Sequence, residues 1–185
     1  MNAGAPQPVL VTGASGGVGL SAVQLARLDG ARVLAVTSSA SKVEALEAAG
    51  AHEVIVSPNL DFAAEVRRRS GGDGVNVVLE IVGSATFAQS LRCIAPGGRL
   101  VVVGNLVTRD VTLNPGLVIV KELEIIGAFA TDQSELEQAL KLTADRSIQP
   151  FISEALPLAD AAIAHSRLEQ RGVAGRIVLV PRAAA

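Results

Sequence analysis

The segment VLVTGASGGVG, residues 9–19, joins a β-branched run to a helical pattern through a cluster of small residues. Glycines without Cβ atoms let backbone amides approach a pyrophosphate closely, and a helix N-terminus attracts anions. Because the loop follows the first predicted strand and opens the first predicted helix, we predict a dinucleotide site rather than a turn without a ligand. The candidate cofactor contacts in this loop are Thr12, Ser15, Gly16, Gly17 and Val18.

The residues after the second predicted strand bear on which nicotinamide dinucleotide would bind. A site for NAD usually carries Asp or Glu about 20 residues beyond the loop, for the ribose 2′-hydroxyl. No acid lies between Val33 and Val43, where the chain instead carries Thr37, Ser38 and Lys42. Hydroxyls and an ammonium would hold a 2′-phosphate that a carboxylate would repel. We therefore predict NADP(H) rather than NAD(H), although a helix cap with a solvated lysine would show the same residues.

These loops require strands that bring them to one edge of a sheet. Short apolar runs alternate with helical patterns, which implies right-handed βαβ crossovers. The predicted strands span 9–11, 32–36, 53–56, 75–82, 99–104 and 123–129, and helices span 17–28, 61–69 and 85–94. The predicted fold class is α/β: a doubly wound, six-stranded parallel Rossmann sheet of order 3-2-1-4-5-6, with helices on both faces.

A capping box and a second helix cap mark two further helices. Ser41 to Glu44 begins a helix that Gly50 ends, and Asp132 to Glu135 begins one that reaches about Arg146. After Pro150, a strand near 152–156, a helix over 158–170 and a strand over 175–180 form a strand–helix–strand tail. We expect a disordered leader at 1–8, a dinucleotide-binding domain at 9–146 and the tail at 147–185.

Composition excludes several classes of function. The net charge is −2, and four Phe with no Tyr or Trp leave few aromatic rings for stacking on bases, so nucleic-acid binding is not predicted. No apolar run approaches the ~18–20 residues of a membrane-spanning helix. A single cysteine excludes an intramolecular disulfide and a Cys-rich zinc site. We expect a soluble, cytoplasmic protein.

The glycine loop fits two enzyme templates. Residues 12–19 satisfy TGxxxGxG of short-chain dehydrogenases, and residues 14–19 satisfy AxGxxG, used by medium-chain dehydrogenases and quinone reductases. Short-chain enzymes normally protonate their substrate with the Tyr of a Tyr-x-x-x-Lys pair. Since the chain has no tyrosine, an ordinary catalytic member of that family is excluded, while a non-catalytic member stays open.

Several separated segments together resemble a known family: VLVTGASGGVGLSAVQLARLDGARVLAVTSS, NVVLEIVG, APGGRLVVVGN and GRIVLVP. In order and spacing they are similar to the cofactor-binding half of medium-chain dehydrogenase/reductases, in the quinone oxidoreductase and zinc-type alcohol dehydrogenase branch. The resemblance runs from about Val9 to Pro181. Two departures are Ala14, in place of the first glycine of GxGxxG, and Ser57, where many NADP-dependent relatives carry a tyrosine near the adenine.

The resemblance implies a role for each segment. The glycine loop would hold the pyrophosphate with Gly16, Gly17 and Val18. The residues after the second strand would hold the adenosine ribose and its phosphate, namely Thr37, Ser38 and Lys42. The ends of the fourth and fifth strands would face the nicotinamide with Val82, Gly83, Gly104 and Asn105. Strand 123–129 would pair with its twin across a dimer axis.

Complete relatives also carry a substrate-binding domain before the first strand, where this chain has residues 1–8. That domain supplies the catalytic zinc ligands or the substrate pocket, so we expect no catalytic residue and no zinc in this chain. We expect Cys93 to be buried in the packing, and His52 and His165 to lie on the surface. The run Arg67 to Arg69 suits a helix C-terminus.

The leading hypothesis is an NADP(H)-binding domain of a medium-chain oxidoreductase that lacks its catalytic domain. The enzyme would transfer hydride to or from an enone, quinone, enoyl thioester or alcohol/carbonyl substrate. The alternative is a non-catalytic NADPH sensor or interaction module; a methyltransferase is disfavoured because an acid ending the second strand is missing. Without the substrate domain, Phe151, Ile152, Ile177 and Leu179 would lose cover. We therefore expect a homodimer, a swapped arrangement or a separate substrate-domain chain as partner.

Overall fold

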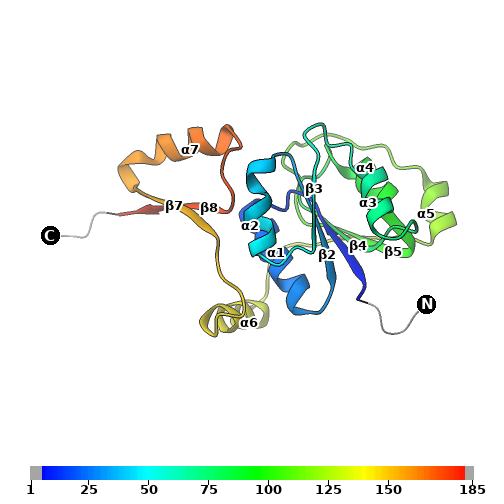
Figure 1. The fold of residues 1–185 in the computed structure, drawn as a ribbon, viewed down its shortest axis with the longest axis horizontal. Helices are drawn as coiled ribbons and strands as arrows, with labels where there is room; N and C mark the ends of the chain where they lie inside the picture. The colour runs from blue at the N-terminus through cyan, green and yellow to red at the C-terminus, as the bar shows by residue number, and fades with distance from the viewer. Residues whose placement is uncertain (1–5, 182–185) are drawn as a thin grey trace.

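The computed structural model describes residues 6–181; positions 1–5 of the predicted leader and 182–185 of the tail lie outside the described residues. Six parallel strands form one sheet in the order β3-β2-β1-β4-β5-β6 (Figure 1). This confirms the predicted doubly wound order. A separate parallel pair, β7 and β8, forms a second small sheet in the tail.

The strands are β1 (Pro8–Val11), β2 (Arg32–Thr37), β3 (Glu53–Val56), β4 (Val75–Glu80), β5 (Ile94–Val102), β6 (Glu124–Gly127), β7 (Ile152–Pro157) and β8 (Arg176–Val180). The α-helices are α1 (Gly17–Leu28), α2 (Val43–Ala48), α3 (Ala63–Arg69), α4 (Phe87–Cys93), α5 (Pro115–Lys121), α6 (Gln133–Ala144) and α7 (Ala161–Glu169), and the 3₁₀ turns are η1 (Ala40–Lys42) and η2 (Leu158–Asp160).

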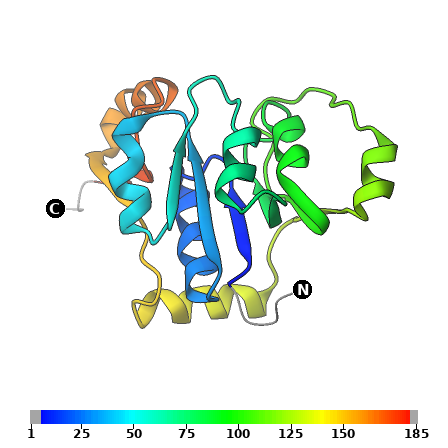
Figure 2. The same cartoon turned by 45° about the vertical axis from the view of Figure 1, so that its right-hand side comes forward.

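Helices cover the two faces of the large sheet (Figure 2). On one face α1 and α2 pack against the sheet through Leu20 and Leu46, and on the other α3, α4 and α5 surround a cluster that contains Phe62. Neighbouring residues of β1 serve opposite faces, since Leu10 belongs to one cluster and Val11 to the other. Strands that are buried on both faces appear in the sequence as short continuous apolar runs, and these runs located the strands.

The missed helix α5 lies in a region that the sequence analysis left without structure. It begins after Asn114, whose side-chain oxygen accepts from the Gly116 amide at 2.9 Å, and Pro115 occupies its first position. Both are standard start signals for a helix. None of its residues is fully buried, and only Leu117 and Val118 pack against the core. A helix of seven residues with two such contacts shows too short an apolar pattern to be predicted.

The predicted capping box at Ser41 is wrong, whereas the predicted helix cap at Asp132 is confirmed and is itself a capping box. Ser39 caps η1 instead: its side-chain oxygen accepts from the Ser41 amide at 3.3 Å. At α6, Asp132 accepts from the Glu135 amide at 2.8 Å and the Glu135 carboxylate accepts from the Asp132 amide at 3.1 Å. The cluster of serines at 38, 39 and 41 offers several equivalent caps, and the backbone selects one of them.

Helix α6 lies at the bottom of both views, at the end of the sheet opposite the glycine loop (Figures 1 and 2). Its residues are exposed except Leu142, and Leu136 and Leu140 are 51% and 61% exposed. Within residues 6–181, no helix combines the length and the apolar character that crossing a membrane requires.

The tail returns to the glycine loop. The Gly175 amide donates to the Ser15 carbonyl at 2.9 Å, and Gly16 and Gly175 form an isolated parallel bridge. On the same side, the Gln149 amide donates to the Gln24 side chain at 2.8 Å, which ties the segment before β7 to α1. The C-terminal tail therefore contributes to the same edge of the sheet as the glycine loop, far away in sequence.

A close approach between β1 and α1 should set the stability of the fold. A Cβ added at Gly19 would overlap the Ala14 carbonyl, whereas one added at Gly127 would meet nothing within 4 Å. We expect Gly19→Ala to lower the free energy of unfolding by about 2 kcal/mol, because helix and loop must separate. Urea denaturation measures it, with Gly127→Ala as the matched control; equal losses in both variants would contradict the assignment.

Candidate cofactor site

The carboxyl ends of β1, β2, β4 and β5 meet at one edge of the sheet, around the point where the strand order reverses between β1 and β4. In open α/β sheets, ligands bind in the crevice at such a point. The residues predicted to bind cofactor lie at the ends of these four strands, in the loops that follow them, in the first turn of α1, or, for Lys42, at the end of η1. The structure therefore assembles them at one end of the sheet.

The start of α1 is open to an anion. Gly16 is the exposed N-cap residue in an extended conformation, no side chain caps the helix, and its first turn contains no acid. A Cβ at Gly16 would meet only the Gly13 carbonyl, at 3.5 Å, whereas Gly13 has φ +56° and a Cβ there would press on Val82 at 2.9 Å. The loop thus combines uncapped amides with close backbone packing, and this donor set suits a pyrophosphate.

The adenosine side contains the predicted hydroxyls and ammonium. The Thr37 hydroxyl at the end of β2 lies 3.4 Å from the Ser15 hydroxyl, which joins the glycine loop to the second strand. Ser38 follows and is half-buried. Lys42 ends η1 with only 6% of its surface exposed. Burial lowers the pKa of its ammonium, and the positive charge of Arg171 lowers it further.

The two loops predicted to face the nicotinamide are joined by hydrogen bonds. The Leu106 amide donates to the Val82 carbonyl at 3.0 Å, and the Ser84 amide donates to the Asn105 side chain at 3.2 Å. Gly83 has φ +89°, and a Cβ there would lie 2.5 Å from the Asn105 oxygen. Gly104 approaches the backbone just after β4 as closely, since its Cβ would overlap the Ile81 carbonyl. These contacts bring Val82, Gly83, Gly104 and Asn105 together.

Thr12 is completely buried, and Ser15, Thr37 and Lys42 are also buried. The Thr12 hydroxyl is used inside the protein: it donates to the Glu80 carboxylate at 2.8 Å and accepts from the Ile81 amide at 3.0 Å. The structure therefore places Thr12 beneath the loop surface, where it supports the loop.

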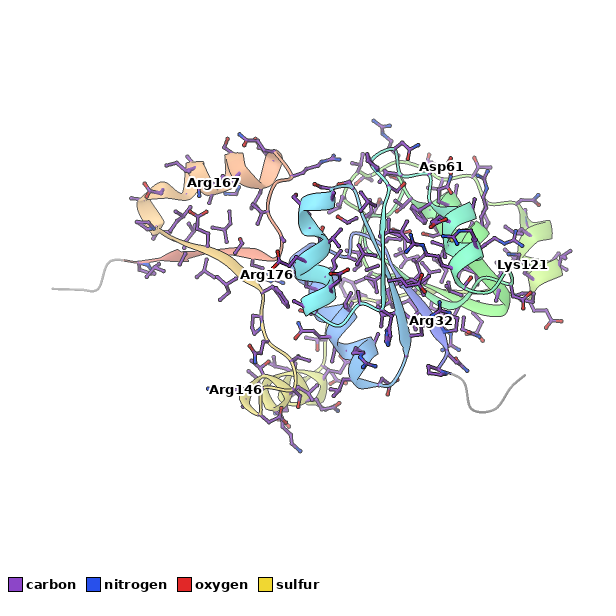
Figure 3. The ribbon with its side chains drawn as sticks, viewed as in Figure 1. Arg32, Asp61, Lys121, Arg146, Arg167 and Arg176 are labelled. Carbon is purple, nitrogen blue, oxygen red and sulfur yellow. The ribbon has the colours of Figure 1, made fainter. Side chains whose placement is uncertain are left out.

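Two arginines of the tail were missed by the sequence analysis. A Cβ added at Gly17 would lie 2.6 Å from Nε of Arg176, so this guanidinium lies against the first turn of α1 (Figure 3). Arg171 is close enough to Lys42 to lower its pKa. In the sequence, Arg171 precedes the last predicted strand and Arg176 lies within it, and no local pattern indicated that this strand returns to the glycine loop.

A family model described as zinc-binding dehydrogenase matches residues 17–145. Acryloyl-coenzyme A reductase of Metallosphaera sedula is 37% identical over 174 residues, which cover 94% of this chain and 50% of that enzyme. Quinone oxidoreductase of Homo sapiens is 32% identical over 183 residues, covering 95% of this chain and 55% of that enzyme. The chain thus spans about half the length of these relatives.

Solved structures agree. The crystal structure of AibC is 67% identical with a TM-score of 0.88, covering 97% of this chain and 50% of that one. A mycobacterial protein, Rv1454c, whose structure contains NADPH, is 28% identical with a TM-score of 0.81, covering 97% of this chain and 60% of that one.

The described residues do not fit a zinc ion. Nowhere in residues 6–181 do three or more His, Cys, Asp or Glu side chains gather as a metal site would require. Cys93 is buried in the α3–α4 cluster, and His52 and His165 are exposed on different elements. His52 already accepts from the Val33 amide through Nδ1 at 3.0 Å.

The Cys93 thiol should be unreactive. Burial raises its pKa to about 12, so almost no thiolate exists near neutral pH, and surrounding side chains block reagents. We expect Ellman's reagent at pH 8 to label the native protein at least about 100-fold more slowly than the same protein unfolded in urea. Equal labelling rates would contradict the buried placement of Cys93.

Proposed function

This chain belongs to the zinc-binding dehydrogenase family, whose cofactor-binding domain it matches, and we propose that it binds NADP(H) as part of a medium-chain oxidoreductase. The proposal rests on one observation: cationic side chains lie at two places near the carboxyl ends of the strands. Arg176 lies on the first turn of α1, and Lys42 and Arg171 lie close together beyond β2. These two places correspond to a pyrophosphate and a 2′-phosphate.

The second place supports NADP(H) over NAD(H). Burial, and after it the positive charge of Arg171, lowers the pKa of Lys42, so the charged ammonium is unfavourable in the unliganded site. A doubly charged phosphate bound to the ammonium would stabilise the charged form, whereas a ribose hydroxyl would not. No acid lies between Val33 and Val43, which removes the group that usually binds the 2′-hydroxyl of NAD. The NADPH bound in the mycobacterial relative agrees with this choice.

In the whole enzyme, the bound nicotinamide would supply hydride transfer to or from an enone, quinone, enoyl thioester or alcohol/carbonyl substrate. This chain would hold the pyrophosphate with the amides of Gly16, Gly17 and Val18, and hold the adenosine end with Thr37, Ser38 and Lys42. The interlocked loops at Val82–Gly83 and Gly104–Asn105 would orient the ring by their shape. We assign no proton transfer to this chain, because a separate substrate domain would position the substrate.

We further propose that residues 9–146 are the cofactor domain and that the tail from 147 packs on the substrate domain. Ile152 of β7 and Val178 and Val180 of β8 are exposed, as expected of a surface that another domain covers. Phe151, Ile177 and Leu179 are half-buried.

A homodimer through β6 is the second part of the proposal. β6 is an edge strand of the large sheet, and all four of its residues are exposed, including Ile125 and Ile126. Phe129, just beyond it, is 99% exposed. An apolar edge with unpaired backbone groups is a template for pairing with a second copy.

Removing the two cations beyond β2 should weaken NADPH selectively. We expect Lys42→Ala and Arg171→Ala each to raise the Kd of NADPH about tenfold, since each loses a charge-assisted contact, and to leave the Kd of NADH nearly unchanged. Fluorescence of the reduced nicotinamide measures both constants. Arg92→Ala, which removes an exposed arginine from α4 on the other face, is the control. Tighter NADH than NADPH binding by the unaltered protein, or unchanged NADPH affinity in Lys42→Ala, would refute the assignment.

Charge placed on the β6 edge should separate the dimer. We expect Ile125→Lys to convert a dimer into a monomer, because burying an unpaired ammonium at a sheet edge is costly. Light scattering coupled to size exclusion measures the mass, and Leu136→Lys on the exposed α6 is the matched control. A monomeric unaltered protein, or a dimer that persists in Ile125→Lys, would refute pairing through β6.

A further inference from the structure

Glu80, the last residue of β4, is completely buried beneath the loops of the cofactor site. It is the single acid in an otherwise apolar strand end, and the function proposed above gives it no role. Five groups donate hydrogen bonds to its carboxylate: Thr12 Oγ1 at 2.8 Å, Thr86 Oγ1 at 2.6 Å, the Val82 amide at 3.0 Å, the Gly83 amide at 2.9 Å, and Ser90 Oγ. Four of the five reach the same oxygen, Oε1, and only Ser90 reaches Oε2.

Every one of these donors is neutral. No lysine, arginine or histidine forms an ion pair with Glu80 anywhere in the described part of the chain. A buried carboxylate without a counter-ion loses much of its hydration energy, and neutral donors recover only part of it. A glutamine could accept at Oε1 from the same four groups at a smaller desolvation cost. Hydrogen bonding alone therefore does not require a negatively charged side chain at this position.

The donors come from three segments that are separate in sequence. Thr12 follows β1 and opens the glycine loop, Val82 and Gly83 form the loop after β4, and Thr86 and Ser90 begin and line α4. One carboxylate thus holds both loops at the point where the strand order reverses. Val82 and Gly83 are also the residues assigned to the nicotinamide side.

We propose that Glu80 is a positioning residue that holds the loop of Val82 and Gly83 in its binding shape, and that its buried charge favours the oxidised nicotinamide over the reduced one. The proposal rests on the proposed binding of NADP(H). The oxidised ring carries a positive charge and the reduced ring carries none. A fixed negative charge in a medium of low dielectric therefore stabilises the first more than the second.

The test compares the Kd of NADP⁺ with that of NADPH in the unaltered protein and in Glu80→Gln. The amide can keep Oε1 toward its four donors while its NH₂ group faces the Ser90 hydroxyl, which can accept. We expect the ratio of the NADP⁺ constant to the NADPH constant to rise on the order of tenfold, because only the charge is removed. Glu137→Gln, an exposed glutamate on α6, is the matched control and should leave the ratio unchanged.

A second variant separates position from charge. Thr86→Val removes one donor and keeps the carboxylate, so it should weaken both nucleotides equally and leave their ratio unchanged. Amide hydrogen exchange without nucleotide should be faster at Val82 and Gly83 in Thr86→Val and in Glu80→Ala than in the unaltered protein. This readout needs no cofactor, and unchanged exchange in both variants would overturn the positioning role.

The outcomes are distinguishable. If the unaltered protein binds both nucleotides and Glu80→Gln changes both constants by the same factor, the charge effect is overturned while the proposed function stands. A shift of the ratio in Thr86→Val as large as in Glu80→Gln would likewise overturn it, because geometry would then account for the ratio; this comparison also serves should Glu80→Gln not fold. If the unaltered protein binds neither nucleotide, the proposed function fails, and the charge effect fails with it.

Discussion

Thr12, after β1, and Glu80, at the end of β4, are joined by a hydrogen bond of 2.8 Å across the point where the strand order reverses. At this point two chains of crossovers run away from each other, so no helix fills the gap above it and the loops need support from below. The carboxylate provides that support to both loops at once. The glycine loop on one side and the nicotinamide loops on the other depend on this shared group for their relative position.

The second constraint is the close packing of glycines against neighbouring residues around the same point. A Cβ added at Gly13 would lie within 3.0 Å of the Val82 side chain, and one at Gly83 within 3.0 Å of Asn105. Such contacts leave little room for adjustment, because protein interiors are densely packed. The shape of these loops is therefore largely set by their own packing.

The sheet could be predicted because its central strands are buried on both faces and so form continuous apolar runs, and the glycine loop because small residues occupy a strand-to-helix turn. α5 was missed because none of its residues is buried, so burial left no period in its sequence. Arg171, Arg176 and Glu80 were missed for a different reason. Their roles arise from contacts across more than 65 residues, such as Glu80 with Thr12, and no local pattern encodes a return of the chain.

The tail explains why the cofactor domain need not be complete by residue 146. Gly175 bonds to Ser15 and brings Arg176 onto α1, so the cations of the site come from both ends of the described chain. In an enzyme whose substrate domain packs on the same tail, movement of that domain would act on β8 and hence on Arg176. The segment that contains β8 and Arg176 would then take part both in binding the pyrophosphate and in closing the substrate pocket. This sharing gives a physical reason for a fold in which the last strand leaves the main sheet yet returns to its first loop.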